Sequence, residues 1–273
     1  MDIIINSYTE NAPKSSTNIL SQNDFMLNVL VQLGQDPLCT PVADLLKSYY
    51  ELEGEWLIAS PIHWEATHND AMIVAFSDTL NLNEPTAKVW FTAVSQFLAQ
   101  DNFQLIYHNP TYWMIQTTNK PCLRSNNLNT LHYKSMRPAL ANLGDTLYWQ
   151  HLLTELQMFL SNHPLNNYRE SSYPINGIWF WGGGQVNYER LTSRPIISNA
   201  TVINNFLRMQ PKAIDPDTNF GKDHILALDH CDAETLAILN KNTKQYQVNW
   251  YWNNIAYQTQ RKNWWGQLFG SDR

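Results

Sequence analysis

Residues 176–185 read Asn-Gly-Ile-Trp-Phe-Trp-Gly-Gly-Gly-Gln, the most distinctive segment of the sequence. The apolar run at 175–181 has the length and the aromatic and β-branched content typical of a buried strand. Gly182, Gly183 and Gly184 follow directly, and without a Cβ they leave their backbone N–H groups open to a ligand. The segment therefore predicts a buried strand that ends either in a ligand site or in a simple glycine turn.

Downstream of the glycines, short apolar runs alternate with helix-like segments. The runs at 194–198 and 224–228 are each followed by a periodic segment, at 200–209 and 233–239. This alternation is typical of a mainly parallel α/β sheet. Residues 245–252 alternate between aromatic and polar side chains, which predicts a last strand that lies at a sheet edge.

Upstream, the chain has a different character. Strand-like runs at 103–107 and 112–117 flank a four-residue turn, which predicts an antiparallel hairpin. The expected fold class is α/β, with an N-terminal α+β module that contains this hairpin and a mainly parallel α/β half after it. The expected parts are a flexible N-terminus, the α+β module, a connector, the α/β module with the glycine-rich loop and a Trp-rich C-terminal tail, at 1–20, 21–120, 121–144, 145–253 and 254–273.

Composition excludes several classes of protein. Charged residues are 15% of the 273-residue chain and the formal net charge is -6, which argues against broad contact with nucleic acid phosphates. No apolar stretch approaches the ~20 residues that span a bilayer, and the N-terminus does not resemble a secretory signal, so we expect a cytoplasmic protein without a transmembrane segment. Cys39, Cys122 and Cys231 form no Cys-x-x-Cys pair and are expected to be reduced, buried packing residues.

A polar cluster precedes the buried strand. In it, Arg169 is a candidate anion ligand, and His163 and Glu170 are candidates for moving a proton. The alternative is a helix end followed by a surface salt bridge. The remaining candidate ligand-binding residues, besides the three glycines, are Asn166, Asn176 and Trp181.

A second polar group follows the strand expected at 224–228. Asp229, His230 and Asp232 would emerge at its carboxyl end, and carboxylate with imidazole suits Zn or Mn better than Mg or Ca. The alternative is that one of the two aspartates caps the helix that begins near Ala233.

Residues 56–63, 155–170 and 174–184 resemble an uncharacterised proteobacterial family whose members are labelled cofactor-independent phosphoglycerate mutase-like or regulatory protein of the RpfE type. The Trp-rich strand with its three glycines is the most specific part of this resemblance. The resemblance implies an alkaline-phosphatase-like α/β fold and metal-dependent phosphoryl transfer. The chain contains no Asp-Gly-x-Gly, a motif expected in the mutase group.

The sequence leaves three functions open. The first is a binding or regulatory protein that holds a small anionic, phosphorylated metabolite at Gly182 to Gly184. The alternative is a phosphohydrolase or phosphomutase-like enzyme with one divalent metal, Mn or Zn, at Asp229 and His230. The third is an interaction scaffold that docks a protein partner through the aromatic tail at 261–269. The first two require the glycine loop, the Arg169 cluster and the Asp229 corner to share one pocket.

Overall fold

The computed structural model describes residues 1–66, 68, 70–169 and 172–260 and divides the chain into two units. Residues 1–37 with the chain from 187 onward form one, which we call the split unit, and residues 38–186 form the other, the inserted unit. Each unit combines helices with a sheet, so the mixed α/β fold class is confirmed. The unit boundaries differ from the expected ones, because the expected connector at 121–144 lies within the inserted unit.

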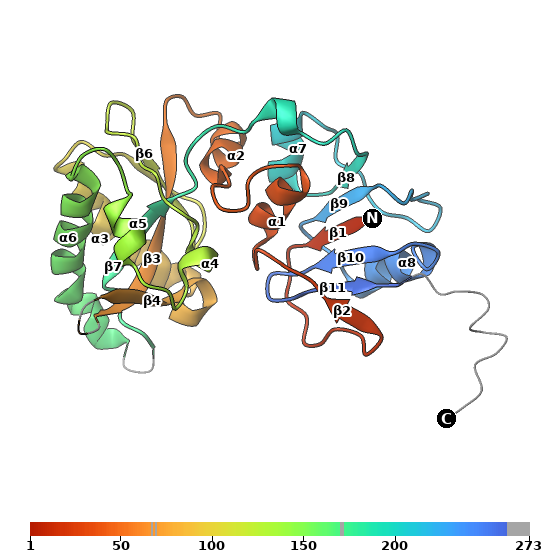
Figure 1. Ribbon diagram of the computed structural model, residues 1–273, viewed down its shortest axis with the longest axis horizontal. Coiled ribbons are helices and arrows are strands. Elements are labelled where there is room, and N and C mark those ends of the chain that lie inside the picture. Colours follow the sequence, from red (N-terminus) through yellow and green to blue (C-terminus); the bar gives the residue numbers. More distant parts are fainter. Residues whose placement is uncertain (67, 69, 170–171, 261–273) are drawn as a thin grey trace. The chain divides into compact units, whose positions relative to one another are not determined.

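The split unit has a six-stranded sheet in the order β2-β11-β10-β1-β9-β8 (Figure 1). Strands β8, β9, β1 and β10 run parallel, and β11 and β2 are antiparallel additions. The expected parallel half is therefore present, although its central strand comes from the N-terminus. The elements are β1 (Asp2–Ile5), β2 (Ser16–Asn18), α1 (Phe25–Gln32), β8 (Ile196–Ser198), α7 (Thr201–Leu207), β9 (Ile225–Leu228), α8 (Ala233–Asn242), β10 (Val248–Tyr251) and β11 (Ala256–Thr259).

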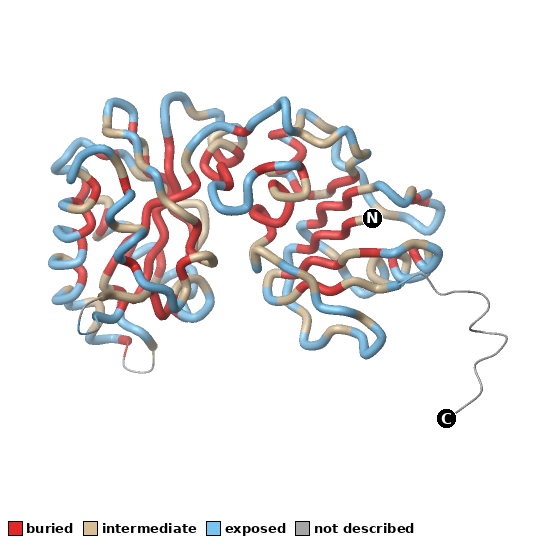
Figure 2. Tube along the Cα trace, in the orientation of Figure 1, coloured by how far each residue is buried: buried red, intermediate tan, exposed pale blue. Residues whose placement is uncertain are grey.

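The N-terminus is a correction to the sequence analysis, which expected residues 1–20 to be flexible. Ile3, Ile4 and Ile5 have no exposed surface, and their strand pairs with β10 on one side and β9 on the other (Figure 2). A continuous apolar run suits this position because a central parallel strand is covered on both faces. Ile3 and Ile5 join the core that Leu226 and Trp250 help to form.

The edge position expected for residues 245–252 is also wrong. Strand β10 lies between β1 and β11, and its alternating aromatic residues cover one side of the core. Strand β11, within the segment expected to be a tail, closes this side of the sheet together with β2. The remaining part of the expected tail, 261–273, lies outside the described residues.

The inserted unit has an antiparallel sheet built on the long strand β3, which pairs with β4, β6 and β7. Strand β5 pairs with β6, so the predicted hairpin is confirmed. The elements are α2 (Val42–Tyr49), β3 (Trp56–Ala66), β4 (Ala71–Phe76), α3 (Glu84–Ala99), β5 (Leu105–Tyr107), β6 (Trp113–Gln116), α4 (Leu128–Leu131), α5 (Arg137–Ala141), α6 (Tyr148–Ser161) and β7 (Gly177–Trp181). Short 3-10 turns occur at Ser77–Leu80, Pro164–Tyr168 and, in the split unit, Tyr188–Arg190.

Strand β7 is the strand that precedes the glycines, and it belongs to this antiparallel sheet. Trp181 is opposite Ile58 and Gly177 is opposite Ile62, so the expected place in the parallel sheet is wrong. All five residues of β7 are nevertheless buried, partly because helix α6 packs on the strand. The rings of Trp149 and Phe180 lie 5.6 Å apart in this contact. A strand of an antiparallel sheet that is covered by a helix can thus be as apolar in sequence as a strand of a parallel sheet, because its residues are buried in both cases.

Among the described residues, no helix is both long and apolar enough to cross a bilayer.

Candidate functional site

The glycine turn after β7 is half packed and half open. Gly182 adopts a positive φ of 69° and its carbonyl accepts a 2.9 Å hydrogen bond from the backbone N–H of Ala43, at the start of α2. A Cβ on Gly183 would lie 2.4 Å from the Leu57 side chain, so this glycine permits a close approach to β3. A Cβ on Gly184 would have no atom within 4 Å. Gly182 and Gly183 therefore serve packing, and Gly184 borders open space.

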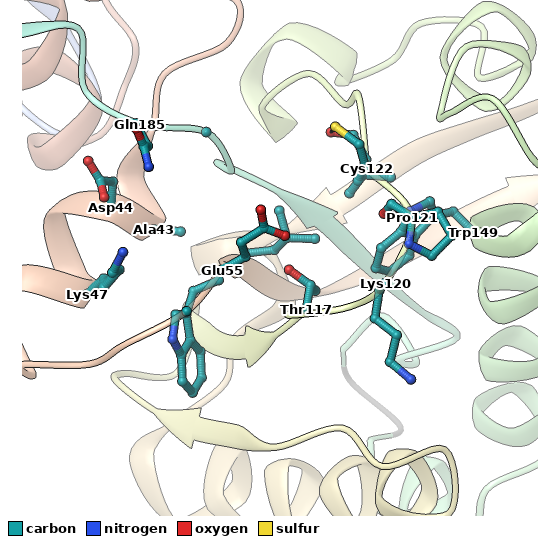
Figure 3. Close-up of a pocket in the computed structure, with 15 residues that line it drawn as sticks. Ala43, Asp44, Lys47, Glu55, Thr117, Lys120, Pro121, Cys122, Trp149 and Gln185 are labelled. Carbon is teal, nitrogen blue, oxygen red and sulfur yellow. Dashed lines mark hydrogen bonds between the residues drawn. The ribbon is translucent and has the colours of Figure 1, made fainter.

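That space is a cavity of about 300 Å³ inside the inserted unit (Figure 3). Its walls come from α2, the start of β3, the segment after β6, the first turns of α6 and the end of the glycine turn. The lining residues are Ala43, Asp44, Lys47, Gly54, Glu55, Trp56, Leu57, Thr117, Lys120, Pro121, Cys122, Leu123, Trp149, Gly184 and Gln185. Its volume lies at the lower end of the range for small-molecule sites.

Three hydrogen bonds fix the walls of this cavity. Asp44 accepts a 2.9 Å bond from the backbone N–H of Val186 and so ties the chain after the glycine turn to α2. The indole N–H of Trp149 donates to the Pro121 carbonyl at 2.9 Å. The backbone N–H of Thr117 donates to the Glu55 carbonyl at 2.8 Å. Each wall is therefore held by protein groups, without help from a ligand.

Several polar groups in the cavity have no protein partner among the described residues. The Thr117 side chain is only 6% exposed, its hydroxyl makes no hydrogen bond there, and it faces the cavity next to Glu55 (Figure 3). The Lys47 ammonium and the Glu55 carboxylate line the same cavity, and neither forms an ion pair within the described part of the chain. Within the described residues, the Thr117 hydroxyl is not one of the fully buried atoms without a partner, Lys47 is half-buried and Glu55 is exposed. Solvent therefore reaches these groups, and a ligand that enters the cavity can replace that solvent.

Lys120 also lines the cavity, but its ammonium is engaged elsewhere. It donates to the Asp101 carbonyl at 2.9 Å and lies 4.5 Å from the centre of the Phe103 ring. Lys47 is therefore the lysine of the lining whose ammonium has no partner in the described residues.

Arg169, expected to bind an anion, acts as a structural clamp. It is 8% exposed and donates to two backbone carbonyls, that of Tyr173 at 2.9 Å and that of Leu80. Burial lowers the pKa of its guanidinium from the ordinary value. The side chain thus joins two segments of the inserted unit, and it does not line the cavity.

The two asparagines expected near the ligand also bridge the backbone. Asn166 donates to the carbonyls of Leu160 and Ile175 at 2.9 and 3.0 Å. Asn176 exchanges two hydrogen bonds with the backbone of Trp64, at 2.8 and 2.9 Å. Both carboxamides therefore have structural partners.

The other expected site residues of the inserted unit are likewise held by the protein. The indole N–H of Trp181 donates to the Ser60 hydroxyl at 3.0 Å in the buried core. The Nδ1 atom of His163 accepts a 3.3 Å bond from the Leu165 N–H, and its ring lies 5.1 Å from those of Trp90 and Phe159. Glu170 lies outside the described residues.

The expected metal ligands follow β9 in the split unit. Asp229 accepts a 2.6 Å hydrogen bond from the Asn6 carboxamide. Asp232 is the N-cap of α8 and accepts a 2.8 Å bond from the Thr235 N–H, a contact that lowers the pKa of its carboxyl. The cap alternative is thus confirmed for Asp232. His230 is exposed, and its carbonyl accepts a 2.8 Å bond from Asn199.

No group of three or more His, Cys, Asp or Glu side chains suited to a metal occurs among the described residues. The three expected groups also do not line one pocket, because every residue of the cavity belongs to 38–186 and Asp229 belongs to the split unit.

Sequence reasoning missed the residues that the cavity brings together. Lys47, Glu55, Thr117 and Gln185 belong to segments far apart in the chain, and each alone is an ordinary polar residue. Antiparallel pairing of β3 with both β6 and β7 brings Glu55, Thr117 and the glycine turn together. Hydrogen bonds from Ala43 to Gly182 and from Val186 to Asp44 place α2, which carries Lys47, beside them. The strand ending in three glycines was the available signal, and it marks one wall only.

The fold and the site define a mixed α/β protein whose inserted antiparallel unit contains a polar cavity. No protein-family model and no curated protein matches the chain in sequence. Among solved structures, a cofactor-independent phosphoglycerate mutase from Thermoplasma acidophilum DSM 1728 is similar with a TM-score of 0.35 and 12% identity, over 96% of this chain and 89% of that chain. A similarity at this level assigns neither a family nor an activity to the chain.

Proposed function

We propose that the protein binds a small anionic metabolite, such as a phosphate monoester, in the cavity beside Gly184. The observation that carries the proposal is the set of cavity groups that the described protein leaves unpaired: the Lys47 ammonium, the Thr117 hydroxyl and the backbone N–H groups of Gly184 and Gln185. Cations and backbone N–H groups in a glycine turn are the donors that a phosphate or carboxylate accepts.

Local structure supports this assignment. Gly184 has a φ of 94°, a conformation that favours glycine, and no side chain fills the space next to it. Lys47 lies on α2, the helix that Gly182 and Val186 anchor through backbone hydrogen bonds. The donors of α2 and of the glycine turn are therefore held in a fixed relation, which lowers the entropy lost when a ligand binds.

Metal-dependent phosphoryl transfer stays a prediction of the sequence, as do a regulatory role and docking through the tail. In the described part of the chain, no group of three or more His, Cys, Asp or Glu side chains that could hold a metal ion supports the metal-dependent alternative.

The test is a calorimetric titration of the purified protein with inorganic phosphate, 2-hydroxyethyl phosphate and phosphoglycolate. We expect binding by at least one of them, and we expect Lys47→Gln to weaken it about tenfold, because hydrogen bonds to charged groups contribute about 1.5–3 kcal/mol. The matched control is Lys134→Gln, which removes the same charge from an exposed lysine that does not line the cavity. Equal losses in the two variants, or no binding to the unmodified protein, would overturn the proposal.

A further inference from the structure

A carboxylate in the cavity points to a more specific class of ligand. Glu55 lines the same space as Lys47, and within the described residues no cation lies within ion-pair distance of it. Figure 3 shows its carboxylate between the wall that carries Lys47 and the wall that carries Cys122. A ligand with anionic groups alone would be repelled by this charge.

We propose that the ligand is zwitterionic, with an anionic group at Lys47 and the glycine turn and a protonated amine at Glu55. This inference rests on the proposed function and names the ligand class of that same site. It assigns a partner to the Lys47 ammonium and to the exposed Glu55 carboxylate, two charges of the cavity lining that form no ion pair within the described residues.

The surroundings of Glu55 fit an ammonium group. Thr117 comes directly after β6, where its hydroxyl oxygen can accept a second hydrogen bond from the amine. The small volume, about 300 Å³, limits the ligand to a short molecule such as an aminoalkyl phosphate or an amino acid.

Matched pairs of probes separate the amine from the anion. O-phosphoethanolamine and 2-hydroxyethyl phosphate share the phosphate and differ in amine against hydroxyl, and taurine and isethionate form the same pair for a sulfonate. We expect the amine member of at least one pair to bind at least tenfold more tightly to the unmodified protein. A tenfold difference corresponds to about 1.4 kcal/mol.

Substitution of Glu55 assigns the preference to its carboxylate. Glu55→Gln should remove the preference for the amine member while leaving the hydroxyl member bound as before or better. Glu53→Gln is the matched control, because this exposed neighbour does not line the cavity and should keep the preference.

The expected burial of the cysteines is wrong for Cys39 and Cys122, which are both exposed. Cys122 lines the cavity and therefore provides an independent measure of occupancy. Alkylation with iodoacetamide followed by peptide mass spectrometry should be slower at Cys122 when the amine probe is bound. Cys39, also exposed, is the internal reference, and burial raises the pKa of the Cys231 thiol to about 11, which keeps that site slow.

The outcomes distinguish the two proposals. Equal affinity for both members of each pair, with loss in Lys47→Gln, overturns the zwitterion and keeps the anion site. A preference that survives in Glu55→Gln overturns the assignment of the amine to Glu55. Absence of binding and of Cys122 protection with every probe overturns both proposals.

Discussion

One polar region in each unit differs from the other in how its side chains are partnered. At the carboxyl ends of the parallel strands of the split unit, Asn6, Asn199 and Asp229 are joined by hydrogen bonds of 2.6 and 2.8 Å. In the inserted unit, Lys47 and Thr117 face a cavity without a protein partner among the described residues. Ligands often bind at the carboxyl ends of parallel strands. Here Asn6, Asn199 and Asp229 at that position hydrogen-bond with one another, and the cavity beside Gly184 lies in the antiparallel unit.

This difference separates polar residues with a structural role from polar residues that are candidates for binding a ligand. Most buried polar groups in proteins are hydrogen-bonded, so a bridging carboxamide needs no functional explanation. An unpartnered hydroxyl in a cavity does need one. Arg169 and Asn176 belong to the first kind, although their residue types suggest a ligand site.

The largest expected effect tests the centre of the split unit. Ile3→Ala in β1 should lower the free energy of unfolding by about 2–5 kcal/mol, because it removes a fully buried side chain from the central strand. Urea denaturation followed by circular dichroism measures the change. Leu20→Ala is the control: this residue is 95% exposed and the change should stay within about 0.5 kcal/mol. Similar losses in both variants would contradict the central position of β1.

The next effect compares a tied polar group with an open one. Asn199→Ala should cost about 1–3 kcal/mol, because its carboxamide accepts from the Asp229 N–H and donates to the His230 carbonyl, both at 2.8 Å. Thr117→Val removes a hydroxyl that has no protein partner in the described residues, so it should leave stability unchanged or raise it while weakening the ligand. Thermal unfolding with and without the ligand measures both. A large loss of stability in Thr117→Val would show that its hydroxyl has a structural role.

Local patterns in the sequence predicted individual elements well, and long-range pairing was the part they could not supply. The turn between 103–107 and 112–117 was enough to predict the β5–β6 hairpin, because both strands and their connection are local. Strand β1 was missed because four residues in a polar terminus carry little periodic signal. Its partners lie more than 200 residues away in the chain, at Ile225 and Asn249.

The candidate site divides in the same way. The three glycines marked a real wall of the cavity, since Gly184 borders it. The residues expected to share a pocket with the glycines were wrong, because β7 was expected in a parallel sheet beside Asp229 and instead pairs with β3 in the antiparallel sheet. Glu55 and Thr117 become neighbours of the glycine turn through antiparallel pairing on β3, and Lys47 through the hydrogen bonds that join α2 to Gly182 and Val186. No single segment encodes these long-range contacts.

The smallest expected effect concerns the helix cap of the split unit. Asp232 accepts a hydrogen bond from the Thr235 N–H at the start of α8, and this bond lowers the pKa of the folded carboxyl below the value of the unfolded chain. A group whose folded pKa is lowered stabilises the protein above its unfolded pKa, which is about 3.9, and loses this contribution as the pH falls through the folded pKa. The stability difference between the unmodified protein and Asp232→Ala should therefore be present at pH 7 and shrink below pH 4. Urea midpoints at pH 7, 4 and 3 measure it, with Asp217→Ala as an exposed control outside α8. A stability difference that stays constant with pH would mean that the ionised carboxylate of Asp232 does not act as the cap. The alternative role of Asp232, as a metal ligand together with Asp229 and His230, would then have to be tested.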